Sequence, residues 1–264
     1  MNCRIIPCQL QNKYLIDIKG GILVPIGIIV NVFSIFLGGF LGALGGRKMS
    51  TVFRNNLNMA FSIASITMGI YTIAPMQNLA AVIFAIIIGT GIGTLLHFGD
   101  YIKHGAEWMQ KFISRFVSSP MMLDQETFDA TLITIIVLFC ASGTGIYGSL
   151  TEGMNGDATI LISKSILDFF TAIIFAANLG YVVALIAVPQ FLILMLLFFL
   201  AHLIYPLTTP AMLLDFKAAG GILMLASGFR IVQIKMFPTA DMIPIMIVVM
   251  PISWFWTTII LPLL

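Results

Sequence analysis

The chain has 264 residues, of which 59% are hydrophobic and only 9% are charged, and its formal net charge is +2. A soluble domain carries roughly 25% charged residues, so this composition disfavours a soluble fold and predicts an all-α, polytopic bundle of transmembrane helices. The small basic excess sits in short links beside apolar segments, which is typical of a topology signal and does not indicate nucleic-acid binding. The three cysteines, Cys3, Cys8 and Cys140, have no metal-ligand spacing and predict no disulfide framework.

The first 20 residues lack the apolar core and the small-residue cleavage site of a signal peptide. We expect either a short tail outside the membrane or a start codon that lies upstream of the genuine one. Residues 21–264 are then a single integral membrane domain.

Apolar runs close to the length of about 20 residues that crosses a bilayer predict about eight membrane segments. In chain order these segments cover residues 21–44, 57–73, 78–98, 130–150, 157–179, 181–205, 216–233 and 241–261. The polar residues between the third and fourth segments, 99–129, are expected to form a loop. Residues 151–156 are expected to form a short link.

Basic residues predict the orientation of these segments. Basic residues lie in three links. Arg47, Lys48 and Arg54 follow segment one, and Lys103, Lys111 and Arg115 follow segment three. Lys235 follows segment seven, and Arg230 lies near the end of that segment. These three links fall on one side of the membrane if all eight segments span. The positive-inside rule then places the N-terminus outside the cytoplasm, although Arg4, Lys13 and Lys19 in the tail oppose this orientation.

Two short similarities suggest a weak inverted repeat. Segments two and seven share an Ile and a Gly at a shift of 159 residues, and each is followed by a Pro and, three positions later, an Asn or Asp: Ile63, Gly69, Pro75 and Asn78; Ile222, Gly228, Pro238 and Asp241. A Gly-Thr-Gly-Ile tetrapeptide also recurs at residues 89–92 and 143–146. In both cases the copies lie an odd number of spans apart, so they have opposite orientation, as is common in secondary transporters. Chance similarity between glycine-rich apolar helices is the alternative.

The segment at residues 157–179 carries a lysine and an aspartate in the middle of an apolar run. One ionised group at bilayer depth costs roughly 2.5–3.5 kcal/mol on insertion scales, so such a residue is by default a functional hypothesis. Lys164 and Asp168 are four positions apart and share a helical face, on which they can pair, and Thr171 continues that face. The alternative is a structural ion pair that neutralises itself.

Small and polar residues form two further candidate features. Segment one carries a stripe on one helical face: Gly27, Asn31, Ser34, Gly38 and Gly42. This stripe favours close helix packing, and Asn31 is a candidate to contribute an amide to a cavity instead. The glycine-rich end of segment four predicts irregular backbone, which is tolerated at membrane depth only beside protein or a wet cavity. A cation site there would use Ser142, Gly143, Thr144 and Gly145, and an ordinary helix break is the alternative.

Several runs resemble those of the YqgA/YdfK-like bacterial membrane proteins, the domain-of-unknown-function family 554. The central run is VLFCASGTGIYGSLTEGMNGDATILISKSILDFFTAIIFAANLG at residues 137–180, and others are PLTTPAMLLDF at 206–216, the GG…SG-x-R-I segment at 220–231, IKMFP at 234–238 and the early run at 27–46. The resemblance covers the chain from about Ile22 to its end. It implies a bacterial inner-membrane protein with no established activity, and it supplies no catalytic or binding residues to carry over.

The chain contains no H-E-x-x-H, G-x-S-x-G or P-loop motif, so we expect no enzyme, no cofactor and no metal site. The leading hypothesis is a secondary transporter or permease for a small solute or ion. Its pathway would be lined by Lys164, Asp168 and Thr171 and by the break at residues 142–145, with Asp168 binding a cation or proton. The rival is a non-transporting membrane scaffold, sensing or assembly partner in which the pair is an internal strut. The lipid bilayer is the expected partner, and homo-oligomerisation stays open.

Overall fold

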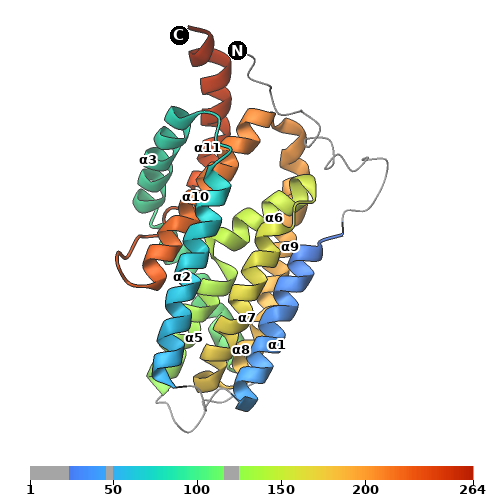
Figure 1. Cartoon of the computed structure of the whole chain (residues 1–264), viewed down its shortest axis with the longest axis vertical. Helices are drawn as coiled ribbons and strands as arrows, with labels where there is room; N and C mark the ends of the chain where they lie inside the picture. Colours follow the sequence, from blue (N-terminus) through green and yellow to red (C-terminus); the bar gives the residue numbers. More distant parts are fainter. Residues whose placement is uncertain (1–23, 46–49, 116–124, 264) are drawn as a thin grey trace, which may run out of the picture.

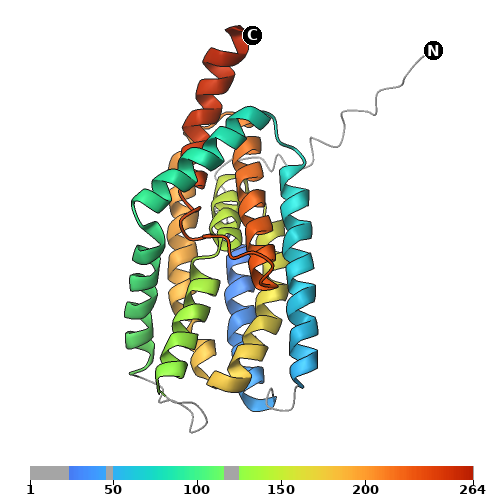
Figure 2. The ribbon, with the colours of Figure 1, turned by 90° about the vertical axis from the view of Figure 1, so that its left-hand side faces the viewer.

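The computed structural model describes residues 24–45, 50–115 and 125–263, and the regular structure within these ranges is helical. The tail expected at residues 1–20 lies outside them. Figures 1 and 2 show an elongated bundle in which most helices run along the long axis of the molecule. In chain order the helices are α1 (Ile26–Gly45), α2 (Thr51–Ile73), α3 (Leu79–Leu95), α4 (Phe98–Ile113), α5 (Gln125–Cys140), α6 (Gly143–Asn155), α7 (Thr159–Leu179), α8 (Val182–Leu185), α9 (Ala187–Ile204), α10 (Pro210–Ile231) and α11 (Ile245–Phe255). The turn η2 (Tyr205–Leu207) follows α9, and η3 (Trp256–Ile260) and η4 (Leu261–Leu263) extend α11.

The prediction of an all-α polytopic bundle is confirmed, and the predicted number of spans is roughly right. Six helical stretches in the described ranges are long and apolar enough to cross a bilayer. They are Ile26–Gly45, Gln125–Asn155, Thr159–Leu179, Val182–Leu207, Pro210–Ile231 and Ile245–Leu263. Helices α3 and α4, which are bent by 59° with respect to each other, make a seventh if they count as one span. Helix α2 has 23 residues and packs lengthwise on α10, but it does not reach the same apolar composition.

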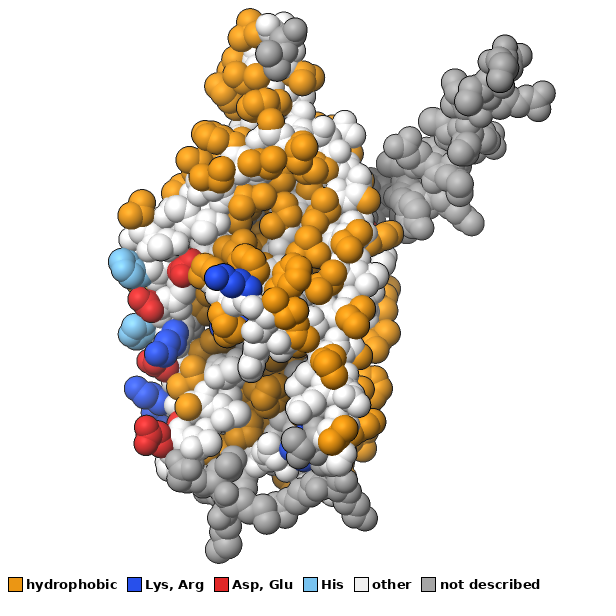
Figure 3. Space-filling model, turned by 60° about the vertical axis from the view of Figure 1, so that its left-hand side comes forward, with side chains coloured by type: hydrophobic (Ala, Val, Ile, Leu, Met, Phe, Trp, Pro, Cys, Tyr) orange, Lys and Arg blue, Asp and Glu red, His pale blue; other side chains and the backbone are white. Residues whose placement is uncertain are grey.

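Two polar stretches that were expected to be irregular are helical. Residues 98–113 form α4 instead of a loop, with Ala106, Gln110 and Ile113 buried on one face against α5. Its opposite face is charged, and Figure 3 shows Lys, Asp or Glu, and His side chains gathered along this edge of the molecule. A helix that is apolar on one face only has low average hydropathy, so a search for membrane-length apolar runs misses it. The expected link at residues 151–156 is also wrong, because α6 continues to Asn155 and ends at Gly156, whose φ of 75° is a left-handed cap.

The helix positions agree with an inverted repeat at the shift of 159 residues, whereas the two Gly-Thr-Gly-Ile tetrapeptides, in α3 and α6, do not follow this shift. A shift of 159 residues carries α1, α2 and α3 onto α9, α10 and α11, and each helix packs on its counterpart. At the α2–α10 crossing, Ser62 Oγ donates to the Gly228 carbonyl at 2.7 Å and Ser65 Oγ donates to the Met224 carbonyl at 2.9 Å. Position 62 corresponds to 221 and position 69 to 228, so the contact of Ser62 with Gly228 implies a reciprocal contact of Gly69 with Gly221.

That reciprocal contact is observed. A Cβ on Gly69 would lie 2.7 Å from the Gly221 carbonyl oxygen, and a Cβ on Gly221 would lie 2.7 Å from the Gly69 carbonyl oxygen. Residue numbers rise along one helix as they fall along the other, so the two copies are antiparallel. Such a self-complementary contact is what a twofold axis produces in a homodimer, and here it relates two parts of one chain.

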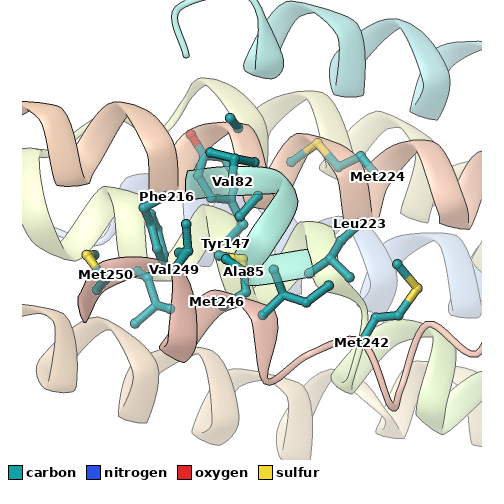
Figure 4. Packing of buried hydrophobic residues seen from close by; sticks show 14 of the residues in the cluster. Val82, Ala85, Tyr147, Phe216, Leu223, Met224, Met242, Met246, Val249 and Met250 are labelled. Carbon is teal, nitrogen blue, oxygen red and sulfur yellow. The ribbon is translucent and has the colours of Figure 1, made fainter. Parts of the chain in front are cut away.

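The two larger of three buried hydrophobic clusters among the described residues join most helices of the bundle. The first lies where α3, α6, α10 and α11 meet, and Figure 4 shows its Tyr147, Phe216 and Met246 packed against one another. The rings of Tyr147 and Phe216 are 5.8 Å apart, between centroids. The second cluster joins α1, α4, α5, α7 and α8. Both clusters are apolar, so the polar side chains that lie between the repeats stand out from their surroundings.

Candidate functional site

Helix α7 carries the two charges of the candidate site on its buried face. Lys164 Nζ and Asp168 Oδ2 form an ion pair, as their spacing predicts, and their side chains are only 4% and 10% exposed. The Lys164 ammonium also lies 5.9 Å from the centre of the Phe139 ring, which is within cation–π range. Pairing allows both charges to remain at this depth, because an unpaired buried charge would be strongly destabilising.

Glycines on α1 let a third polar side chain reach the pair. The backbone of α1 approaches α7 so closely that a Cβ on Gly38 would contact the Phe169 carbonyl and one on Gly42 would lie 2.6 Å from Ile173 Cα. On the same face of α1, Asn31 Nδ2 donates to Asp168 Oδ2 at 2.8 Å. The stripe of small residues on α1 therefore serves close packing through its glycines and contributes a polar contact through Asn31.

Helix α9 supplies a fourth member, Gln190, which the sequence analysis missed. Gln190 is fully buried, and its Nε2 donates to Asn31 Oδ1 at 2.8 Å and to the Phe139 carbonyl at 3.4 Å. Asn31 and Gln190 are 159 positions apart and therefore occupy equivalent positions in the two repeats. Applying the shift of the repeat to Asn31 would have identified Gln190 from the sequence.

Lys164, Asp168, Asn31 and Gln190 form a polar cluster, and two of its donors converge on one carboxylate oxygen. Lys164 and Asn31 both bond to Asp168 Oδ2, and within the described ranges no hydrogen bond reaches Asp168 Oδ1. Gln190 Oε1 is buried and also has no partner there. The cluster thus has one positive and one negative charge, two amides and two acceptor oxygens that remain available.

The predicted helix break is shorter than its glycines suggest. Only Ala141 and Ser142 are non-helical between α5 and α6, and Ser142 Oγ accepts from the Gly145 amide at 3.1 Å as the N-cap of α6. Gly145 contacts the pair, because a Cβ there would lie 3.4 Å from Lys164 Cε. Gly143 packs against Leu223 of α10 instead, with 2.8 Å between its ideal Cβ and Leu223 Cβ.

Two predicted residues lie beside the polar cluster without joining it. Thr144 is buried at the start of α6, and Thr171 is half-buried on α7 after Asp168. Among the contacts of the described residues, no hydrogen bond connects either hydroxyl to Lys164 or Asp168. Thr171 follows Asp168 on α7, but the polar contacts of Asp168 come from Lys164 on the same helix and from Asn31 on α1.

Two other buried carboxylates cap helices. Glu152 accepts from the backbone amides of Gly27 at 2.6 Å and Ile28 at 3.2 Å, at the start of α1. Asp215 accepts from the amides of Gln77 and Asn78 at 3.0 and 2.8 Å, before the start of α3. Helix N-termini carry partial positive charge and free amides that favour a carboxylate. These acids therefore stabilise helix starts, whereas Asp168 binds a side-chain ammonium.

Comparison with known proteins supports the family resemblance. The family described as "Protein of unknown function (DUF554)" matches residues 26–254. The chain is 42% identical over 232 residues to "Uncharacterized protein YqgA" of Escherichia coli (strain K12). The matched region covers 88% of this chain and 97% of that protein. It is 25% identical over 222 residues to "Uncharacterized membrane protein YdfK" of Bacillus subtilis (strain 168), covering 84% of this chain and 93% of that protein. No solved structure matches the chain significantly. The membrane-length helices and the membrane-protein relative support a multi-pass membrane protein. Because the family match covers most of its length, the chain belongs to the DUF554 family.

Proposed function

We propose that this protein is a secondary transporter or permease for a small solute or ion in the bacterial cytoplasmic membrane. The observation that carries the proposal is the position of the polar cluster at the contact between two inverted repeats. Asn31 and Gln190, one from each repeat, bond to each other, and Asn31 bonds to Asp168. In transporters built from inverted repeats, the substrate site lies at the repeat interface, and intramembrane charges mark the pathway.

The geometry suggests how access would alternate. Movement of one repeat against the other changes the Asn31–Gln190 contact and, through Asn31, the environment of Asp168. Asp168 would bind a cation or proton, and Lys164 would neutralise the carboxylate when that ligand is absent. The Asp168 carboxylate would thus keep a positive partner through the cycle, because an unpaired buried charge is strongly destabilising.

A thermal-shift screen in detergent tests the proposal. Wild type, Lys164→Ala, Asp168→Ala and the double variant are heated with inorganic ions, amino acids, organic acids and nucleosides. A transporter predicts that at least one solute raises the melting temperature of wild type and leaves the folded Asp168→Ala variant unchanged. The matched control is Asp157→Ala, which removes the acid from the half-exposed Lys217–Asp157 pair, whose nitrogen and oxygen are 3.9 Å apart.

The opposite result would favour a non-transporting scaffold. In that case no solute shifts wild type, both single variants melt early, and the double variant recovers because no unpaired charge remains. The ion pair would then be an internal strut, and the transport proposal would lose its main support.

A further inference from the structure

An apolar groove lies next to the polar cluster. Its volume is about 690 Å³, within the range of roughly 300–1,000 Å³ for small-molecule sites. Residues of α4, α5, α6, α9 and α11 line it, together with parts of α10 and the loop before α11. Cys140 and Ala141 at the α5–α6 break, Ile146 of α6 and Ile193 of α9 belong to this lining.

These four lining residues adjoin the polar cluster along the chain. Cys140 follows Phe139, whose carbonyl accepts from Gln190, and Ile146 follows Gly145, which contacts Lys164. Ile193 lies about one helical turn after Gln190. Of the two non-helical residues of the break, Ala141 lines the groove, and Ser142 caps the helix that carries Gly145.

The unused atoms of the cluster specify the ligand chemistry. Gln190 Oε1 is a buried acceptor without a partner among the described residues, which costs about 1–3 kcal/mol, and Asp168 Oδ1 is a second acceptor that no described donor reaches. A ligand that donates hydrogen bonds removes this cost. A positive ligand can replace Lys164 as the partner of the Asp168 carboxylate, whereas an anion would place a second negative charge beside that carboxylate. An inorganic cation would satisfy the oxygens but would make no use of the groove.

We propose that the site takes an organic ammonium with an apolar body. The body occupies the groove, and the ammonium passes the α5–α6 break to bond Asp168 Oδ1 and Gln190 Oε1. This inference rests on the proposed function and narrows its substrate class. It makes Gln190 a specificity-determining residue, because this side chain supplies the acceptor that distinguishes a donor-bearing cation from other cations.

Binding to the full chain in lipid nanodiscs tests the inference. The probes are 2-phenylethylamine, its N,N,N-trimethyl analogue, which is a cation without N–H donors, 3-phenylpropionate and sodium chloride, and empty nanodiscs correct for partitioning into lipid. We expect saturable binding of 2-phenylethylamine, with the trimethyl analogue and 3-phenylpropionate weaker by on the order of tenfold or more.

Variants separate the two parts of the site. Gln190→Met and Asp168→Asn should each weaken 2-phenylethylamine binding by on the order of tenfold. Ala141→Leu should weaken binding by filling the groove, whereas Ala80→Leu at an exposed position of α3 should not. A melting curve of each variant identifies those that fail to fold, and the comparison of probes on wild type stands without any variant.

Three results would overturn the inference: no saturable binding of 2-phenylethylamine to wild type, equal binding of 3-phenylpropionate, or unchanged binding to folded Asp168→Asn. These results differ from failure of the proposed function. If the solute screen finds another ligand that depends on Asp168, transport stands and only the ammonium assignment is lost.

Discussion

Asn31 of α1 and Gln190 of α9 are joined by a side-chain hydrogen bond of 2.8 Å and occupy the same position in two inverted repeats, 159 residues apart. The same separation relates Ser65 to Met224 at the centre of the α2–α10 crossing. Both contacts therefore lie on the internal twofold axis. One of them is part of the polar cluster, so the cluster cannot keep its present bonds if the repeats change their relative position. This coupling gives the ion pair of α7 a direct connection to the symmetry of the fold.

Removing one charge of the pair should destabilise the protein more than removing both. Asp168→Asn leaves the Lys164 ammonium buried without its carboxylate, and breaking a buried pair in this way costs about 3–5 kcal/mol. The double variant Lys164→Met with Asp168→Asn buries no charge and should regain most of that stability. Equilibrium unfolding in mixed micelles measures all three free energies. Additive losses in the double variant would contradict the pairing, and Asp157→Asn at the half-exposed pair should change stability by less than about 1 kcal/mol.

The sequence predicts much of this fold because apolar length and periodicity are local properties. The helical character, most spans and the shift between Gly69 and Gly228 all follow from short stretches. Helix α4 does not, because charged residues on its exposed face alternate along the sequence with the residues of its buried face, and its average composition is that of a loop. The link between α6 and α7 was placed too early for a similar reason, since Glu152 looks like a surface residue until its partners on α1 are known.

The candidate site was predictable only in part. Lys164 and Asp168 meet because they are one helical turn apart, and periodicity alone shows this. The partners of Asp168 and Asn31 lie 137 and 159 positions away, and periodicity shows which residues share a face but not which faces meet. Gln190 is therefore a tertiary contact, which only the repeat could have revealed. Thr171 shares the face of Asp168, but none of the hydrogen bonds described for the cluster includes it.

The close approach of α1 to α7 should make Gly42 intolerant of a larger side chain. A Cβ at this position would lie 2.6 Å from Ile173 Cα, so Gly42→Ala should separate the helices and cost about 1–3 kcal/mol by overpacking. The matched control is Gly91→Ala in α3, where a Cβ meets nothing within 4 Å. That change should be neutral or stabilise the helix by up to about 1 kcal/mol. Thermal unfolding in detergent distinguishes the two, and equal effects would refute the close packing.

Asp215 should be essential for the position of α3. Besides the two backbone amides, its carboxylate accepts from Asn78 Nδ2 at 2.9 Å and from Ser253 Oγ at 2.6 Å, so it connects α10, α3 and α11. In Asp215→Asn an amide group would face some of these donors, and we expect a loss of about 1–3 kcal/mol for each one left unsatisfied. Ser253→Ala removes a single bond and should cost about 1 kcal/mol. Limited proteolysis and unfolding of the purified variants compare the two losses of stability. A larger loss in Ser253→Ala than in Asp215→Asn would contradict the prediction.

The distribution of basic residues predicts that the C-terminus lies outside the cytoplasm. If α2 spans in addition to the seven stretches described above, eight passes return the chain to the side on which α1 begins. In Figure 1 the C-terminus lies at the end of the bundle opposite to the end of α1 and the start of α2. Lys103, Lys111 and Arg115 belong to α4 and the residues that follow it, and the positive-inside rule places the end of α4 in the cytoplasm. Alkaline phosphatase fused after Leu263 should be active and a green fluorescent protein fused there should be dark. Fusions after Arg115 should give the reverse pattern. If both sites report the same compartment, an even number of spans separates them, and one of the five membrane-length stretches between α5 and the C-terminus does not cross the bilayer.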